Sequence, residues 1–164
     1  DPETDLVLVH DAARPLVSPV TIACVIDEAR RSGAAIAAVR EKNTVKVVDS
    51  NGIVKKTPER AQLWEVQTPQ GFKREIVEEA YQNAMQDGTM GTDDASLVER
   101  LGVPVKVVTS DYRNIKITTP EDLLIVEAFL REGRLAKAKE GIGNVLSDLA
   151  AKVEKHMKRQ EDKE

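Results

Sequence analysis

The chain has 164 residues, of which 41% are hydrophobic and 32% charged, with a formal net charge of -4. This length suits one domain with a buried core, and the negative charge gives no electrostatic case for binding nucleic acid or an anionic membrane. The single cysteine, Cys24, excludes an internal disulfide framework and a multi-cysteine zinc site, so a reducing, cytoplasmic setting is expected. No apolar run in the sequence reaches the length of a bilayer span, and residues 1–5 have neither the basic start nor the apolar stretch that a secretory signal would need, so none is expected.

The first forty residues predict a strand, a helix and a second strand. Residues 6–9, "LVLV", form a continuous apolar run, which is typical of a strand covered on both faces. Ser18 and Pro19 are good N-cap and first-turn residues for a helix that runs to about Ser32 and ends at Gly33. A second buried strand is expected over residues 34–41, joined to the first by a right-handed parallel crossover.

A protruding arm is expected over residues 43–62. Two short β-rich runs flank Ser50-Asn51-Gly52, which is a good hairpin turn signal. A two-stranded arm is only marginally stable alone in water. We therefore expect the arm to pack against the domain body or against a second subunit.

Strands and helices alternate again in the second half of the chain. The expected elements are a strand then a loop over residues 63–72, a helix over 73–86, a short helix capped by Thr92 and running through Leu101, strands over 103–111 and 114–118, and a helix capped by Thr119. Together with the first half, this order predicts an α/β domain with a mainly parallel, Rossmann-like sheet. Ligands of such sheets bind beyond the carboxyl ends of the strands.

The last thirty residues differ in composition from the rest. Residues 135–164 are rich in lysine and glutamate, and their apolar residues recur at spacings of three and four. This pattern predicts an amphipathic helical tail that docks on the body or on a partner. We accordingly expect a domain over residues 1–134 and a tail over residues 135–164.

Three reactive side chains follow the first strand. Asp11 at the strand tip could hold a divalent cation or a substrate hydroxyl, or it could equally cap a turn. Arg14 could clamp a phosphate in bidentate fashion, or it could pair with Asp11. His10 alone is more typical of a hydrogen-bonded framework residue than of a catalyst.

Three further residues have two interpretations each. Thr92 is an ordinary helix cap on local grounds, although a threonine there can also bind an anion. Lys116, beside a loop, points either to solvent or to a phosphate. Arg60 follows the arm and is either a surface charge or, if the arm reaches a neighbouring subunit, part of that subunit's site.

Five motifs in order closely resemble the 2-C-methyl-D-erythritol 4-phosphate cytidylyltransferase family. They are "VLVHDAARP", "NTVK", "ERAQLWEVQTPQGF", "TDDASLVE" and "NIKITTPEDLLIVE", and they cover residues 5 to about 132. Five spaced matches are far more specific than any one of them. The ribitol 5-phosphate cytidylyltransferases share much of the pattern and are the nearest alternative.

The resemblance implies a fold and a reaction. The family has a nucleotide-binding α/β sheet, and its β-arm forms a homodimer. It transfers CMP from CTP to 2-C-methyl-D-erythritol 4-phosphate with release of pyrophosphate, using Mg²⁺, in non-mevalonate isoprenoid synthesis. The partners expected from the resemblance are therefore CTP, a polyol phosphate and a second copy of the chain, in the cytoplasm or, for a plant-type source, the plastid.

The resemblance also assigns roles to eight positions. Asp11 resembles the acid that holds substrate hydroxyls near the metal, and Lys116 resembles the basic residue that stabilises charge on the transferring phosphates. The remaining positions are substrate-site or nucleotide-site residues: Ala12 through its backbone at the nucleotide, Arg14 and Thr68 at the substrate, Thr44 and Arg60 on the arm across the dimer interface, and Thr92 on the substrate phosphate.

The chain also departs from the family pattern. The glycine-rich, basic CTP-binding loop and the segment that recognises the base are not found in this sequence, so we expect it to be part of a longer product. The chain alone is then expected to be incomplete as an enzyme. A non-catalytic, dimerising polyol-phosphate-binding module is the alternative from a different functional class.

Overall fold

The computed structural model describes residues 3–134 and residue 147, which form two compact units divided after Thr118. The first unit contains, in order, β1 (Leu6–Val9), α1 (Pro19–Ser32), β2 (Ala34–Arg40), β3 (Val47–Val48), β4 (Val54–Lys56), the 3-10 helix η1 (Arg60–Gln62), β5 (Trp64–Lys73), α2 (Arg74–Asp87), α3 (Asp94–Arg100) and β6 (Lys106–Thr109).

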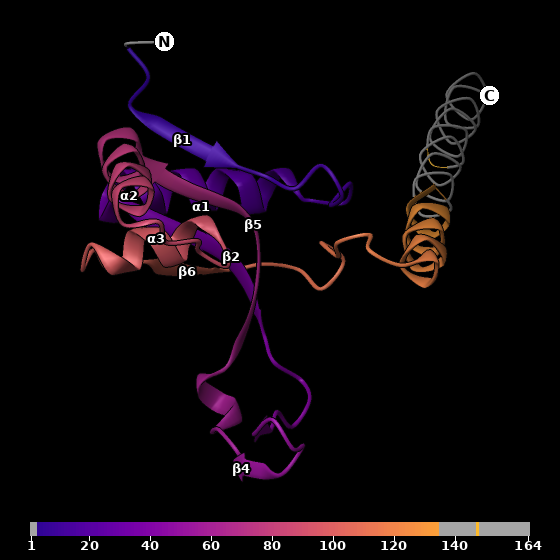
Figure 1. The fold of residues 1–164 in the computed structure, drawn as a ribbon. Helices are drawn as coiled ribbons and strands as arrows, with labels where there is room; N and C mark the ends of the chain where they lie inside the picture. Colours follow the sequence, from indigo (N-terminus) through magenta and orange to yellow (C-terminus); the bar gives the residue numbers. More distant parts are fainter. Residues whose placement is uncertain (1–2, 135–146, 148–164) are drawn as a thin grey trace, which may run out of the picture. The chain divides into compact units, whose positions relative to one another are not determined.

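The main sheet has four strands in the order β1-β5-β2-β6. β5 pairs antiparallel with both β1 and β2, whereas β2 and β6 are parallel. The α/β class is confirmed, but the pairing is mixed rather than mainly parallel. The reason is that β2, the arm and β5 form one long hairpin, so that β5 returns between β1 and β2 and separates them (Figure 1).

Helices cover both faces of this sheet (Figure 1). On one face, Ala35 and Ala37 of β2 pack with Val25 and Ala29 of α1. On the other face, β2 and Phe72 of β5 pack with residues of α2 and α3. The alternation along β2 therefore places small apolar side chains in two cores at once, which explains why the strand is a continuous apolar run.

The helix boundaries follow the expected capping chemistry at most positions. Ser18 Oγ accepts a hydrogen bond from the Thr21 N–H at 3.0 Å, and Gly33 ends α1 with φ +95°. The short helix α3 differs from the prediction, because its N-cap is Asp93 and not Thr92. Asp93 accepts from the Ser96 N–H in a reciprocal capping box, which leaves Thr92 one residue outside the cap.

Two strand predictions were wrong. Residues expected to form a loop after the fifth strand belong to β5, which continues through the cis Thr68–Pro69 peptide to Lys73 and pairs with β1 along this stretch. Residues 114–118 contain no strand. Backbone hydrogen bonds hold this segment at two points, because the Asn114 N–H donates to the Asp111 carbonyl at 3.0 Å and the Ile117 N–H donates to the Ala13 carbonyl at 2.8 Å.

The arm is present as expected. β3 and β4 pair antiparallel, and the turn between them contains Gly52 at φ +78° and the Asp49 carboxylate, whose Oδ1 accepts from the Asn51 and Ile53 N–H groups. The arm extends away from the main sheet beyond the ends of β2 and β5 (Figure 1). Its valines and isoleucine are exposed: Val45, Val47, Val48, Ile53 and Val54.

The second unit contains a helix over residues 120–134. Thr119 Oγ1 accepts from the Asp122 N–H at 3.4 Å, and Asp122 Oδ2 accepts from the Thr119 N–H at 2.8 Å, so the predicted cap is confirmed. The expected amphipathic tail over residues 135–164 lies outside the described residues, apart from Ser147. Within the part of the chain that the structure describes, no helix is long and apolar enough to cross a membrane.

Candidate active site

A pocket of about 590 Å³ lies where the chain leaves β1 beside the middle of β5. Five of the predicted site residues line it, together with side chains from β2, β5 and the start of α3. The pocket lining consists of Val9, Asp11, Arg14, Ile36, Val66, Gln67, Thr68, Gln70, Thr92, Asp93, Asp94, Glu99 and Lys116. The topology thus collects residues from separate parts of the sequence in one place.

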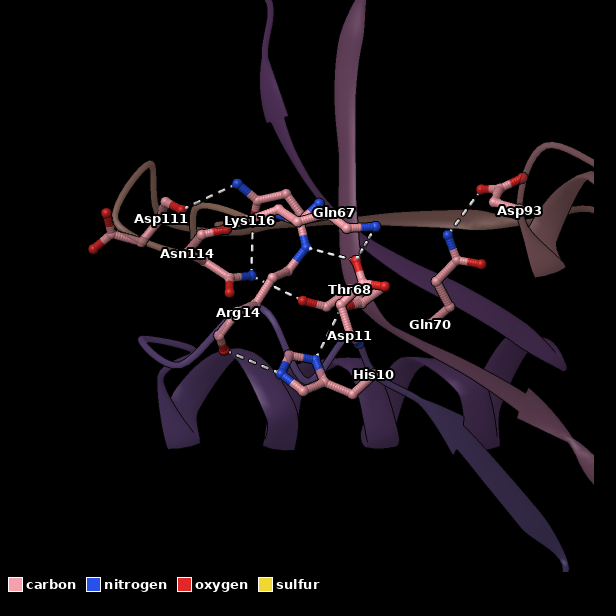
Figure 2. Close-up of polar contacts among 10 residues, drawn as sticks. All are labelled: His10, Asp11, Arg14, Gln67, Thr68, Gln70, Asp93, Asp111, Asn114 and Lys116. Carbon is pink, nitrogen blue, oxygen red and sulfur yellow. Dashed lines mark hydrogen bonds and ion pairs between the residues drawn. The ribbon is translucent and has the colours of Figure 1, made fainter. Parts of the chain in front are cut away.

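The Asp11 carboxylate is the centre of a charged triad. Arg14 Nε donates to Asp11 Oδ2 at 3.2 Å, and Lys116 Nζ contacts the same oxygen at 3.2 Å (Figure 2). The side chains differ in exposure, with Arg14 at 11%, Asp11 at 30% and Lys116 at 46%. Lys116 is therefore the member of the triad with most access to an incoming ligand.

The pKa of Asp11 is held below its ordinary value. Partial burial by itself raises the pKa of this carboxyl, but the hydrogen bonds from Lys116 and Arg14 and the charges of these two cations outweigh that effect. Asp11 is consequently an ionised acceptor at neutral pH. The Arg14 and Lys116 side chains both contact Oδ2 of Asp11, so the two contacts share one oxygen of the carboxylate.

A chain of hydrogen bonds ties the tip of β1 to β5. Thr68 Oγ1 accepts from the Asp11 N–H at 3.0 Å and contacts His10 Nδ1 at 2.9 Å, and His10 Nε2 lies 3.3 Å from the Arg14 carbonyl oxygen. These contacts close the turn that carries Asp11 and Arg14. His10 thus has the framework role that the sequence favoured.

Thr92 lines the same pocket as the triad and directly precedes Asp93, the N-cap of α3. It is exposed, and the next residue, Asp93, accepts from Gln70 Nε2 at 2.8 Å (Figure 2). Gln70 is only 1% exposed, and its Oε1 accepts from the Ala95 N–H at 3.0 Å. One buried glutamine of β5 therefore fixes the first turn of α3 and, with it, the position of Thr92.

The structure does not bring the other predicted site residues into this pocket. Ala12 is exposed in the turn after Asp11. Thr44 and Arg60 are exposed residues of the arm region, and Arg60 Nη1 donates to the Lys42 carbonyl at 3.2 Å. Within one chain, these two side chains belong to the arm and not to the pocket.

Three functional candidates were missed by the sequence reasoning. Gln67, Gln70 and Asn114 are buried polar residues, at 6%, 1% and 1% exposure. Each makes side-chain hydrogen bonds that join two segments around the pocket. Their position inside two motifs was visible in the sequence, but nothing local distinguishes a buried amide from an exposed one.

The lining is acidic overall. It contains the carboxylates of Asp11, Asp93, Asp94 and Glu99 against the two cations Arg14 and Lys116. Four carboxylates against two cations suit a ligand that arrives with its own cations better than they suit a bare anion. Among the described residues, no group of three or more histidine, cysteine or carboxylate side chains could hold a metal ion by itself.

Comparison with known proteins gives the family. The model of the IspD family, 2-C-methyl-D-erythritol 4-phosphate cytidylyltransferase, matches residues 1–132. The chain belongs to this family. A relative of that name from Syntrophus aciditrophicus (strain SB) is 55% identical over 133 residues, which cover 80% of this chain and 57% of the relative. Another from Desulforamulus reducens is 54% identical over 129 residues, covering 79% and 55%.

Solved cytidylyltransferase structures have the same fold. The 4-diphosphocytidyl-2C-methyl-D-erythritol synthase of Anaerococcus prevotii superposes with a TM-score of 0.75 at 38% identity, covering 80% of this chain and 59% of that one. The 2-C-methyl-D-erythritol 4-phosphate cytidylyltransferase of Thermus thermophilus gives 0.70 at 40% identity, covering 77% and 62%. The chain spans a little over half the length of the curated cytidylyltransferases that it matches.

Proposed function

We propose that this chain supplies the polyol-phosphate side of a cytidylyltransferase that transfers CMP from CTP to 2-C-methyl-D-erythritol 4-phosphate. A phosphate oxygen of the polyol phosphate attacks the α-phosphorus of CTP, a new P–O bond forms, and the bond to pyrophosphate breaks. The observation that carries the proposal is the Asp11–Arg14–Lys116 triad in a pocket that Thr68 and Thr92 also line. Family membership supplies the reaction.

The chemistry needs positioning and charge neutralisation more than it needs a proton acceptor. Lys116 is exposed enough to leave Asp11 partly and to donate to phosphate oxygens. Arg14 is nearly buried, and its guanidinium already contacts Asp11 Oδ2 and the Asn114 main-chain carbonyl. Its proposed role is therefore to hold the Asp11 carboxylate in place at the substrate. Thr68 and Thr92 supply hydroxyls along the pocket, with Thr92 assigned to the substrate phosphate.

Magnesium and CTP are part of the proposal. Asp11 is an ionised carboxylate, and Mg²⁺ in nucleotidyl transfer commonly takes one or two protein carboxylates together with substrate phosphates. The acidic lining fits such an ion, for which Asp11 is the proposed protein ligand. Bound Mg²⁺ neutralises charge on the triphosphate. Ala12, exposed in the neighbouring turn, offers its backbone to the nucleotide.

The arm is proposed to form a homodimer. Its exposed valines and isoleucine are an apolar surface that a second arm would cover, and an isolated two-stranded arm is marginally stable. In such a dimer, Thr44 and Arg60 of one subunit contribute to the polyol-phosphate site of the other. A cytoplasmic location stays a prediction from the cysteine content.

Calorimetric titration tests the proposed function. We expect the chain to bind 2-C-methyl-D-erythritol 4-phosphate more tightly than ribitol 5-phosphate. Lys116→Met should weaken this binding at least about tenfold, because a charge-assisted contact is worth roughly 1.5–3 kcal/mol. Lys106→Met, which removes an exposed lysine of β6 outside the pocket, should change it less than about twofold.

Each outcome of this titration has a meaning. A preference for ribitol 5-phosphate would reassign the substrate, and an absence of binding to both polyol phosphates would contradict the proposal. Pyrophosphate release is measured alongside, with CTP and Mg²⁺ present. Tight polyol-phosphate binding without pyrophosphate release by this chain is expected under both the proposed function and the non-catalytic binding module. Pyrophosphate release after a CTP-binding segment of the family has been joined to the chain would support the enzyme, and its absence would support the binding module.

A further inference from the structure

Asn114 is a buried polar residue behind the pocket. Its side chain is 1% exposed and is not part of the pocket lining, although it lies beside Arg14, Gln67 and Thr68 (Figure 2). Burying an amide is costly for each polar atom left without a hydrogen bond; in Asn114 the Nδ2 is bonded, whereas Oδ1 is buried without a partner. The contacts that it makes therefore indicate what it is for.

Asn114 joins three segments of the chain. Its Nδ2 donates to Gln67 Oε1 at 3.0 Å and to the Thr68 carbonyl at 2.8 Å, and both of these acceptors belong to β5. Its main-chain carbonyl oxygen, in contrast to the side-chain Oδ1, accepts from Arg14 Nη1 at 2.7 Å. One residue thus connects β5 to the guanidinium that holds Asp11.

The segment that carries Lys116 depends on such anchors. Residues 110–118 form no helix or strand, so a sheet ladder does not fix their course. Lys116 lies between Asn114 and Ile117, whose N–H donates to the Ala13 carbonyl at 2.8 Å. The lysine is therefore held from both sides, by the Asn114 amide bonded to β5 and by the turn that follows β1.

We propose that Asn114 is a positioning residue, which fixes the Lys116 segment to β5 and holds the Arg14 guanidinium in place against Asp11. It does not touch the ligand and acts through Lys116 and Arg14. Its significance for substrate binding rests on the function proposed above. Its structural part, the clamping of residues 111–117, stands on the contacts of this chain alone.

Amide hydrogen exchange tests the clamp without any ligand. In Asn114→Ala, the exchange rate of the Ile117 amide should rise at least about tenfold, while the amides of the core strand β2 keep their protection. The matched control is Val77→Ala, which shortens a buried side chain of α2 outside the pocket. Val77→Ala should raise the exchange rates of core amides in general, and should not raise that of the Ile117 amide in particular.

Binding measurements test the consequence. Asn114→Ala should weaken the binding of 2-C-methyl-D-erythritol 4-phosphate at least about tenfold, and Val77→Ala less than about twofold. Unchanged Ile117 protection together with unchanged affinity in Asn114→Ala would overturn the inference. Absence of binding by the unsubstituted chain would contradict the proposed function instead, and the exchange data would still decide the clamp.

A second variant covers the case in which Asn114→Ala does not fold. Gln67→Ala deletes one of the two Asn114 acceptors and also the contact of Gln67 Nε2 with the Asp111 carbonyl at 3.3 Å. Faster exchange at Ile117 with retained β2 protection supports the clamp. No change at Ile117 in a folded Gln67→Ala protein overturns it.

Discussion

At the scale of single residues, the site is governed by how Asp11 is paired. A carboxylate with two cations on one oxygen resists protonation, and the direction of its pKa shift reflects the balance of burial against those cations. The motif made Asp11, Arg14, Thr68, Thr92 and Lys116 visible in the sequence. The roles of Asn114, Gln67 and Gln70 could not be predicted, because they depend on the burial of these side chains, which is a property of the folded chain.

The Asp11 pairing predicts a pH dependence of stability. The folded-state pKa lies below the ordinary value of 3.8, so the pairing stabilises the fold above about pH 3.8 and loses this effect as the pH falls toward the lowered pKa. Asp11→Asn removes the ionisable group. Urea unfolding from pH 7 to pH 2.5 should show the unsubstituted chain losing stability relative to Asp11→Asn in the acid range only. A constant difference between the two across this range would contradict the pairing.

At the scale of elements, local signals predicted helices and turns well, and strand neighbours poorly. The caps at Ser18 and Thr119 and the turn at Gly52 were predicted correctly, because each depends on residues within a few positions. The place of β5 between β1 and β2 was not predicted. Pairing joins residues that are far apart in sequence, and the same apolar run can pair in either direction.

Gly33, between α1 and β2, is expected to be a position where a side chain lowers stability. Gly33 has φ +95°, and a Cβ there would lie 2.8 Å from Ile76 Cδ1. Gly33→Ala should therefore lower the free energy of unfolding by more than about 1 kcal/mol in chemical denaturation. Gly133→Ala in the helix over residues 120–134 meets no neighbour within 4 Å and should be neutral or slightly stabilising. Equal effects at both positions would contradict the strain argument.

If the arms form the dimer interface, a charge placed in the arm should change the oligomeric state of the protein. Val54 is 53% exposed on β4, so Val54→Glu should not disturb the fold, but it should place a charge in the proposed arm interface. Sedimentation at micromolar concentration should show a dimer for the unsubstituted chain and a monomer for Val54→Glu, with the same far-ultraviolet circular dichroism spectrum. Val20→Glu, at 71% exposure on α1, is the matched control and should stay dimeric. A monomer for the unsubstituted chain would exclude the cross-subunit roles of Thr44 and Arg60.

At the scale of the whole molecule, the pocket exists only when distant segments have come together. Asp11 contacts Thr68, 57 residues away, and Arg14 contacts Asn114, 100 residues away. A ligand that recognises this arrangement binds the folded state and not the unfolded chain. Its binding must therefore raise the stability of the fold.

This linkage predicts a stabilisation by ligand. A free concentration of 2-C-methyl-D-erythritol 4-phosphate equal to about 100 times its Kd should add about 2.7 kcal/mol to the free energy of unfolding. Thermal melting with increasing ligand measures it, and erythritol, which lacks the phosphate, is the control and should have little effect. Equal shifts from both compounds would show that the phosphate is not recognised.

The sequence by itself determined the α/β class, most helix boundaries and the arm hairpin, because these follow from local periodicity, turn signals and capping chemistry. The site residues that the motifs suggest through family resemblance stay predictions. Only the tertiary structure decided that the sheet is mixed, that Thr92 lies outside its helix cap, and that residues 114–118 are held by Asn114 rather than by strand pairing. The sheet order and the anchoring of residues 114–118 depend on contacts between segments that are distant in sequence, whereas the Asp93 capping box is local and was missed because threonine and aspartate are both good N-cap residues. Contacts between distant segments are set by how the whole chain packs.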